Sequence, residues 1–167
     1  MGKEYTAQEA LKLAIQAEKG CMDFYRRAAS VCRNQRAKKI FELLANEEVG
    51  QLKSFFDHYE GGEFGSDLKA YLASPPDKKS MAYRSLERVI DDETCEQKAL
   101  EIALKEEKNC IEQYSVLVRD IVDPLVRGIF NCVINETQKH YDVIEEEYRH
   151  VMTMVHESDQ NIYVRDD

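Results

Sequence analysis

Two glutamates lie among apolar residues at matching places in this chain, and both are candidates for chemistry. Glu18 and Glu107 each share a helical face with residues that are otherwise apolar, at spacings of three and four. A tyrosine follows seven residues later on the same face, Tyr25 in one case and Tyr114 in the other. An ionised carboxylate in an apolar interior needs a partner. These acids must therefore bind a cation, take up a proton or join a hydrogen-bonded network.

Two further apolar faces each carry a pair of polar residues. Glu48 and Gln51 interrupt one of these faces, and Thr137 and His140 interrupt the other. If the four faces meet, carboxylates, an amide and an imidazole share one interior, and these groups are metal ligands. The spacing therefore predicts a metal-binding bundle centre.

Two acids stand beside these polar pairs. Glu47 and Glu136 are each one position to the side of the apolar face. Glu136 is also four residues before His140 on the same helix and so reaches toward the same interior. Two interpretations of Glu136 stay open, a metal ligand and a surface acid.

The chain repeats itself. Residues 8–59, moved forward by 89 positions, align with residues 97–148 without a gap, and thirteen of the 52 pairs are identical. Similarity at a fixed offset indicates a duplicated unit, here a helical hairpin. The identical pairs include Glu18 with Glu107, Cys21 with Cys110, and Tyr25 with Tyr114.

Four long segments carry helical periodicity, and no strand pattern is present. We expect helices over about 7–32, 35–59, 93–122 and 124–156. The expected N-terminal caps are Thr6 (in a capping box with Glu9), Asn34, Asp92 and Asp123 (followed by Pro124). The turns within each repeat are short, so the two helices of a repeat must be antiparallel neighbours.

A long crossover, residues 61–92, separates the two repeats. The segment Ser74-Pro75-Pro76-Asp77 breaks it, and short helices are expected near 66–73 and 78–90. Two hairpins joined by a long crossover are the layout of a ferritin-like four-helix bundle. We therefore predict one all-α domain over residues 1–167, with repeat 1 at about 7–60, repeat 2 at about 93–156 and a polar tail at 157–167.

Composition excludes several function classes. The net charge of −9 argues against a nucleic-acid groove and against binding to an anionic membrane surface. No apolar run is long enough to span a bilayer, and no signal-peptide pattern opens the sequence. We expect a cytoplasmic protein with neither nucleic acid nor membrane among its partners.

The five cysteines form no C-x-x-C motif, which argues against a disulfide framework and against a zinc knuckle. We expect reduced thiols, most of them buried. Cys21 and Cys110 lie one helical turn past Glu18 and Glu107. Small core residues and soft metal ligands are the two interpretations of this pair that stay open.

These residues resemble the rubrerythrin and ferritin-like di-iron carboxylate proteins over about residues 7–150. In that family two helices supply one glutamate each, and the other two supply a Glu-x-x-His pair each. Glu18 and Glu107 match the single glutamates. The pair Glu48/Gln51 matches one Glu-x-x-His with glutamine in place of histidine. The pair Thr137/His140 matches the other with threonine in place of glutamate.

The resemblance implies a metal site with a reduced ligand set, which leaves one ion or two open. The ligands it implies are Glu18, Glu48, Glu107 and His140, with Glu136 and Gln51 completing the shell. The residues expected around these ligands are Tyr25, Tyr114, Thr137 and Glu47. Iron is the implied metal, with zinc and manganese as alternatives.

The resemblance also implies an activity, iron-dependent oxidation or peroxide reduction. No C-x-x-C motif follows His140, so the electron path of that family is either absent here or lies on a separate electron-donor protein. We also expect a homodimer. The alternative function is a metal-free, non-catalytic bundle that serves dimerisation or partner binding, with its central acids protonated or hydrogen-bonded.

Overall fold

The structure, a computed structural model, describes the backbone of residues 4–163 and the side chains of residues 4–154. No described residue forms a strand, which confirms the predicted all-α class. The elements are α1 (Ala7–Val31), α2 (Gln35–Phe56), α3 (Leu68–Leu72), α4 (Met81–Glu87), α5 (Cys95–Leu117), the short 3-10 helix η1 (Val118–Asp120) and α6 (Pro124–Tyr163).

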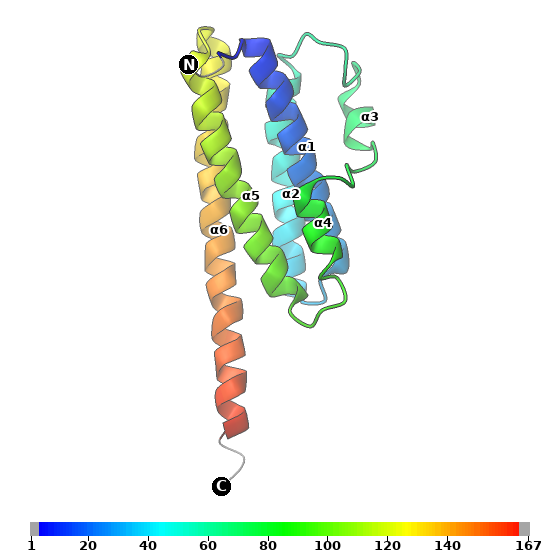
Figure 1. Cartoon of the computed structure of the whole chain (residues 1–167), viewed down its shortest axis with the longest axis vertical. Coiled ribbons are helices and arrows are strands. Elements are labelled where there is room, and N and C mark those ends of the chain that lie inside the picture. Colours follow the sequence, from blue (N-terminus) through cyan, green and yellow to red (C-terminus); the bar gives the residue numbers. More distant parts are fainter. Residues whose placement is uncertain (1–3, 164–167) are drawn as a thin grey trace.

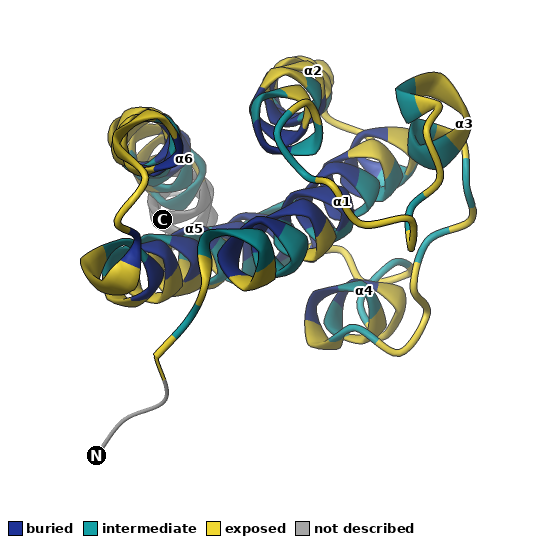
Figure 2. Ribbon diagram, turned by 90° about the horizontal axis from the view of Figure 1, so that it is seen from above, coloured by how far each residue is buried: buried dark blue, intermediate teal, exposed yellow. Residues whose placement is uncertain are grey.

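The four long helices form a bundle of two antiparallel hairpins, α1/α2 and α5/α6 (Figure 1). The hairpins pack side by side, so that α1 contacts α5 and α2 contacts α6. Their buried faces turn toward one another, as the view from above shows (Figure 2). This arrangement confirms the predicted ferritin-like helical bundle. That the hairpins arose by duplication stays an interpretation of the sequence.

Capping residues fix where three of the long helices begin. The Thr6 hydroxyl accepts from the backbone N–H of Glu9, and the Glu9 carboxylate accepts from that of Thr6, which completes the predicted capping box. Asn34 accepts from two backbone N–H groups at the start of α2. Asp123 does the same at the start of α6, where Pro124 is the first helical residue. These caps set the register of each buried face.

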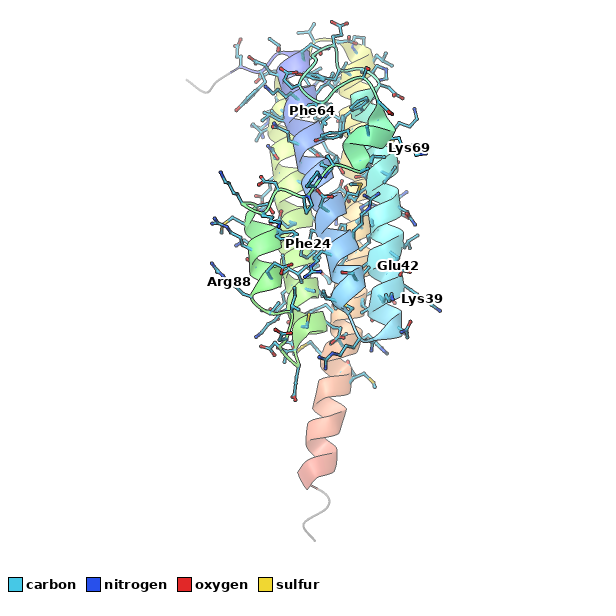
Figure 3. All side chains as sticks on the ribbon, turned by 90° about the vertical axis from the view of Figure 1, so that its right-hand side faces the viewer. Phe24, Lys39, Glu42, Phe64, Lys69 and Arg88 are labelled. Carbon is cyan, nitrogen blue, oxygen red and sulfur yellow. The ribbon has the colours of Figure 1, made fainter. Side chains whose placement is uncertain are left out.

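The crossover packs against helices of both hairpins. Within it, α3 packs on α2, and α4 packs against α1 and α5. Lys19 anchors the segment between them, because its ammonium lies 2.5 Å from the Asp23 carboxylate and donates to the backbone carbonyl of Ser74 at 3.0 Å. Figure 3 shows this side of the molecule, with Phe24 on α1 and Arg88 pointing outward beyond the end of α4.

Three predicted helix boundaries need correction. The second helix ends at Phe56 rather than near residue 59. The third begins at Cys95 rather than near 93, because Asp92 accepts from Thr94 and Lys98 in a turn that precedes the helix. This helix also ends earlier, at Leu117, where the 3-10 turn begins.

The fourth helix continues through the predicted polar tail. Its last residue is Tyr163, because no glycine or proline follows Gly128 to stop it. As a result α6 projects well past the other helices (Figure 1). The remainder of the predicted tail, residues 164–167, lies outside the described residues. Within the part of the chain that is described, no helix is both long and apolar enough to cross a membrane.

Candidate metal centre

All four long helices send a polar side chain into the middle of the bundle. Each of these residues is at most 4% exposed, although the surrounding core is apolar. The set comprises Glu18 from α1, Glu48 and Gln51 from α2, Glu107 from α5, and Thr137 and His140 from α6. The predicted interior residues are therefore buried within one bundle.

Three of these side chains converge on a point. One ligand atom each from Glu48, Glu107 and His140 lies within 4.8 Å of the other two. His140 Nδ1 is 3.4 Å from a Glu48 oxygen and 3.9 Å from a Glu107 oxygen. An ion that binds imidazole nitrogen and carboxylate oxygen at about 2.0–2.2 Å keeps its ligand atoms about 3–4 Å apart. The spacing of the three groups matches that requirement.

The two nitrogens of His140 have different surroundings. Nε2 lies 2.5 Å from the Glu47 carboxylate, whose side chain is 47% exposed at the surface. Nδ1 is buried and makes no hydrogen bond. A carboxylate on one nitrogen holds the N–H proton there and leaves the other nitrogen's lone pair free. The free lone pair of His140 thus faces Glu48 and Glu107.

Two tyrosines hold the carboxylates across the hairpins. Tyr25 of α1 donates to Glu107 of α5, and Tyr114 of α5 donates to Glu18 of α1 at 2.7 Å. Each tyrosine hydroxyl therefore donates a hydrogen bond to the glutamate of the opposite hairpin. Both bonds are buried, so they fix the orientation of the acids without help from solvent.

Several polar atoms at this centre lack partners. Among the described side chains, the buried atoms without a hydrogen bond are Glu18 Oε2, both amide atoms of Gln51, and His140 Nδ1. All of them belong to the bundle centre. A buried polar group without a partner is costly, so this group of atoms favours a bound ion or water among them.

The carboxyl groups are held in an environment that opposes their charge. Burial raises the pKa of Glu107 to about 7, and the hydrogen bond from Tyr25 and the nearby His140 only partly offset this. Burial also raises the pKa of Glu18 and of Glu48 well above the ordinary value. The nearby Glu48 carboxyl raises the pKa of Glu18 further. Burial disfavours the ionised carboxylates, and a cation bound between them would stabilise that ionised form.

The other predicted site residues lie around this cluster. Gln51 is buried beside it, whereas the Thr137 hydroxyl donates to the backbone carbonyl of Val133 at 2.7 Å and so points back along α6. Glu136 is exposed and accepts from the Cys132 thiol. The helix turns Glu136 away because it stands one residue before the buried face. Glu136 therefore lies outside the cluster.

A groove between α2 and α6 leads to the cluster from outside. Its volume is about 540 Å³. Its lining includes Leu43, Glu47, Gln51, Glu136, Lys139 and His140. Since Gln51 and His140 belong to both the groove and the buried centre, a small molecule has a route between solvent and the cluster.

Two features of the centre were not predicted. The first is that each tyrosine serves the glutamate of the other hairpin; the spacing of Tyr25 and Tyr114 placed them near carboxylates without saying which. The second is the approach of Cys21 and Cys110, whose sulfurs lie 3.8 Å apart. The identity of Cys21 and Cys110 in the repeat was the signal that could have indicated this contact.

The comparisons with known proteins agree with this geometry. The family model described as Rubrerythrin matches residues 9–148, which includes all six buried polar residues of the centre. No curated protein and no solved structure matches the chain significantly. The family match spans most of the chain, and the chain therefore belongs to the Rubrerythrin family.

Proposed function

We propose that this protein binds one iron ion between Glu48, Glu107 and His140 and uses it to reduce a small peroxide. The observation that carries the proposal is the free Nδ1 of His140, which faces two buried carboxylates while Glu47 occupies the other nitrogen. Imidazole held in this way by an outer carboxylate is a common metal ligand.

The donor set fits a divalent first-row metal. Carboxylate oxygen and imidazole nitrogen suit iron, manganese and zinc alike, so the choice of iron rests on membership of the Rubrerythrin family. Glu18 is the third carboxylate and the fourth ligand in this proposal, since its second oxygen is buried without a hydrogen bond. One ion is proposed because only one imidazole is present in the cluster.

Bound iron would supply the one-electron chemistry that carboxylates and imidazole lack. The chain's own groups position and protect the site. Tyr25 keeps Glu107 oriented, and Tyr114 keeps Glu18 oriented. Glu47 keeps the proton of His140 on Nε2. The groove between α2 and α6, which Gln51 and His140 line, is the route for the substrate in this proposal.

The test is metal retention followed by peroxide consumption. The purified full chain is loaded with ferrous iron without oxygen, desalted and analysed for metal content, as wild type, Glu107→Gln and Glu136→Gln. Glu136→Gln is the matched control, since it removes an acid of the same region that lies outside the cluster. We expect about one iron per chain in the wild type and in the control, and much less in Glu107→Gln.

Peroxide consumption by the loaded proteins, with an added reductant, completes the test. We expect turnover in the wild type and in Glu136→Gln but not in Glu107→Gln. Iron retention without peroxide turnover would overturn the peroxidase proposal and leave a metal-binding protein. Absence of retained iron in all three proteins would overturn the whole proposal in favour of a metal-free scaffold.

A further inference from the structure

Two cysteines face each other next to the carboxylate cluster. Cys21 of α1 and Cys110 of α5 have sulfurs 3.8 Å apart, and each residue is 7% exposed. They occupy equivalent positions at the 89-residue offset of the sequence repeat. A single buried cysteine is an ordinary core residue. A facing pair from two different helices offers a further chemistry, the formation of a bond between the two sulfurs.

The distance to be closed is small. A disulfide has a sulfur–sulfur separation of about 2.05 Å, so the two atoms must approach by about 1.8 Å in total. Since α1 and α5 already contact each other, rotation of the two side chains is the movement that would bring the sulfurs together. The chain between them includes the whole crossover, and a bond at this point would join the two hairpins directly.

The surroundings of Cys21 favour its protonated form. The contact with Cys110, burial and the nearby carboxyls of Glu48 and Glu107 raise the pKa of Cys21 well above its ordinary value. A protonated buried thiol is a poor ligand for a soft metal, and it reacts slowly with oxidants and with bulky alkylating agents. The close approach of the two sulfurs is therefore the observation that favours a disulfide, since the second thiol lies within reach of a sulfenic acid formed on the first.

We propose that Cys21 and Cys110 are a redox-active thiol pair, which hydrogen peroxide converts into one disulfide that bridges α1 and α5. In the first step one sulfur takes an oxygen from peroxide, the O–O bond breaks, and water and a sulfenic acid form. In the second step the other sulfur displaces that hydroxyl group as water and the S–S bond forms. Two thiols and one peroxide thus give one disulfide and two waters, with two electrons passing from sulfur to oxygen.

This inference needs no metal and is independent of the proposed iron chemistry. It also distinguishes this pair from the other three cysteines. Cys32 and Cys95 are buried, and burial raises the pKa of Cys32 to about 12, with Cys95 as a neighbour. Cys132 is exposed, so it is the cysteine that can form a disulfide between two copies of the chain. Cys32 with Cys95 is therefore the rival pairing, and Cys132 is to be removed.

The test uses the metal-free full chain carrying Cys132→Ser. The protein is treated with one equivalent of hydrogen peroxide, unfolded, alkylated and digested with trypsin. Each remaining cysteine falls in its own tryptic peptide, so mass spectrometry assigns the bond without ambiguity. The peptides are 20–26 for Cys21, 28–33 for Cys32, 89–98 for Cys95 and 109–119 for Cys110.

We expect the loss of two of the four titratable thiols and a cross-linked peptide of residues 20–26 with 109–119. A dithiol reductant should restore both thiols. Cys21→Ser and Cys110→Ser should each abolish the cross-link while Cys32 and Cys95 remain free. The oxidised protein should melt about 10 °C higher than the reduced one, because the bond closes a long loop.

Three results would overturn the proposal. The first is retention of all four thiols after peroxide treatment. The second is a cross-link between peptides 28–33 and 89–98 in place of the expected one. The third is oxidation of Cys21 or Cys110 to sulfinic acid with no cross-link. Because iron is absent throughout, none of these results bears on the metal site, whose failure would appear in the metal analysis alone.

Discussion

The two hairpins contribute different halves of one site. The first helix of each hairpin brings a buried glutamate, Glu18 in α1 and Glu107 in α5, and each accepts from the tyrosine of the other hairpin, but only Glu107 belongs to the cluster with His140. The second helices differ. Where α2 has Glu48 and Gln51, the equivalent positions of α6 hold Thr137 and His140.

Because of this difference, neither hairpin holds a complete Glu-x-x-His pair. The acid of one Glu-x-x-His pair comes from α2, and the imidazole comes from α6, and they meet at 3.4 Å. A metal ion would therefore bridge the hairpins rather than lie within either one. Since an ion bound only by the folded state stabilises it by mass action, such a bridge would also strengthen the contact between the hairpins.

Restoring the missing half of each pair should have the largest effect. In the double variant Gln51→His with Thr137→Glu, both second helices carry Glu-x-x-His. We expect metal content to rise from one ion per chain to two, because the variant gains one carboxylate and one imidazole. Metal analysis after anaerobic loading measures this, with the two single variants as controls. An unchanged content of one ion in the double variant would contradict the view that each hairpin lacks one member of its Glu-x-x-His pair.

Removing the imidazole should nearly abolish metal binding. His140→Gln makes the two hairpins alike, with glutamine at both positions. Taking one partner from a buried charged group costs about 3–5 kcal/mol, so we expect a loss of metal affinity on the order of 1,000-fold. Competition with a chelator measures the affinity. Binding within about threefold of the wild type would show that His140 is no ligand.

The pH dependence of stability should differ in sign between the metal-free and metal-loaded proteins. Burial raises the pKa of Glu107 to about 7, so between pH 4.5 and 7 the folded state holds a proton that the unfolded state has released. The free energy of unfolding of the metal-free protein should therefore fall as pH rises, by about 3 kcal/mol from this residue.

With metal present, the stabilisation by the ion should grow over the same pH range, because the carboxyl must lose its proton to bind. Urea unfolding at pH 5 and pH 7.5, with and without a chelator, gives both slopes. A metal-free protein that becomes more stable as pH rises over this range would show that the buried acids are ionised without a cation.

Two identical residues of the repeat should respond differently to the same change. Glu47 and Glu136 occupy equivalent positions, but only Glu47 contacts His140. Glu47→Gln should weaken metal binding about 10- to 100-fold, the usual cost of losing an outer carboxylate partner. Glu136→Gln should leave affinity unchanged. Equal effects of the two substitutions in the same chelator competition would argue against the role of Glu47.

The smallest effects should come from the two tyrosines. Tyr25→Phe and Tyr114→Phe each remove one buried hydrogen bond to a carboxyl group, so each should cost about 1 kcal/mol of stability. Tyr25 holds Glu107, which belongs to the three-residue cluster, whereas Tyr114 holds Glu18, which lies outside it. Tyr25→Phe should therefore weaken metal binding more than Tyr114→Phe does. Thermal unfolding and metal titration of the two variants test this order.

Local residue chemistry made much of the fold predictable. Thr6, Asn34 and Asp123 are short polar side chains that cap helices, and each does so in the structure. The apolar faces also predicted which polar residues are buried, including Glu18 and His140. The start of α5 was predicted wrongly, because Asp92 accepts from Thr94 in a turn before the helix and α5 begins without a side-chain cap.

The contacts between the hairpins could not be predicted from the sequence. One such contact is the approach of His140 Nδ1 to Glu48, and another is the hydrogen bond that Tyr25 donates to Glu107. Both depend on the rotation and the relative height of helices that are far apart in the chain. Spacing fixes the face of a helix but leaves those two quantities undetermined. The same is true of Glu136, whose position beside the buried face permitted both an inward and an outward side chain.

The central claim is that ligands from both hairpins hold one ion. Anomalous X-ray diffraction at the iron absorption edge, from crystals of the iron-loaded protein, tests this claim most directly. We predict one peak per chain, within bonding distance of Glu48, Glu107 and Nδ1 of His140, so that both hairpins hold the same ion. A peak whose ligands come from one hairpin alone, or a bundle centre with no peak in a protein that retains iron, would contradict this description.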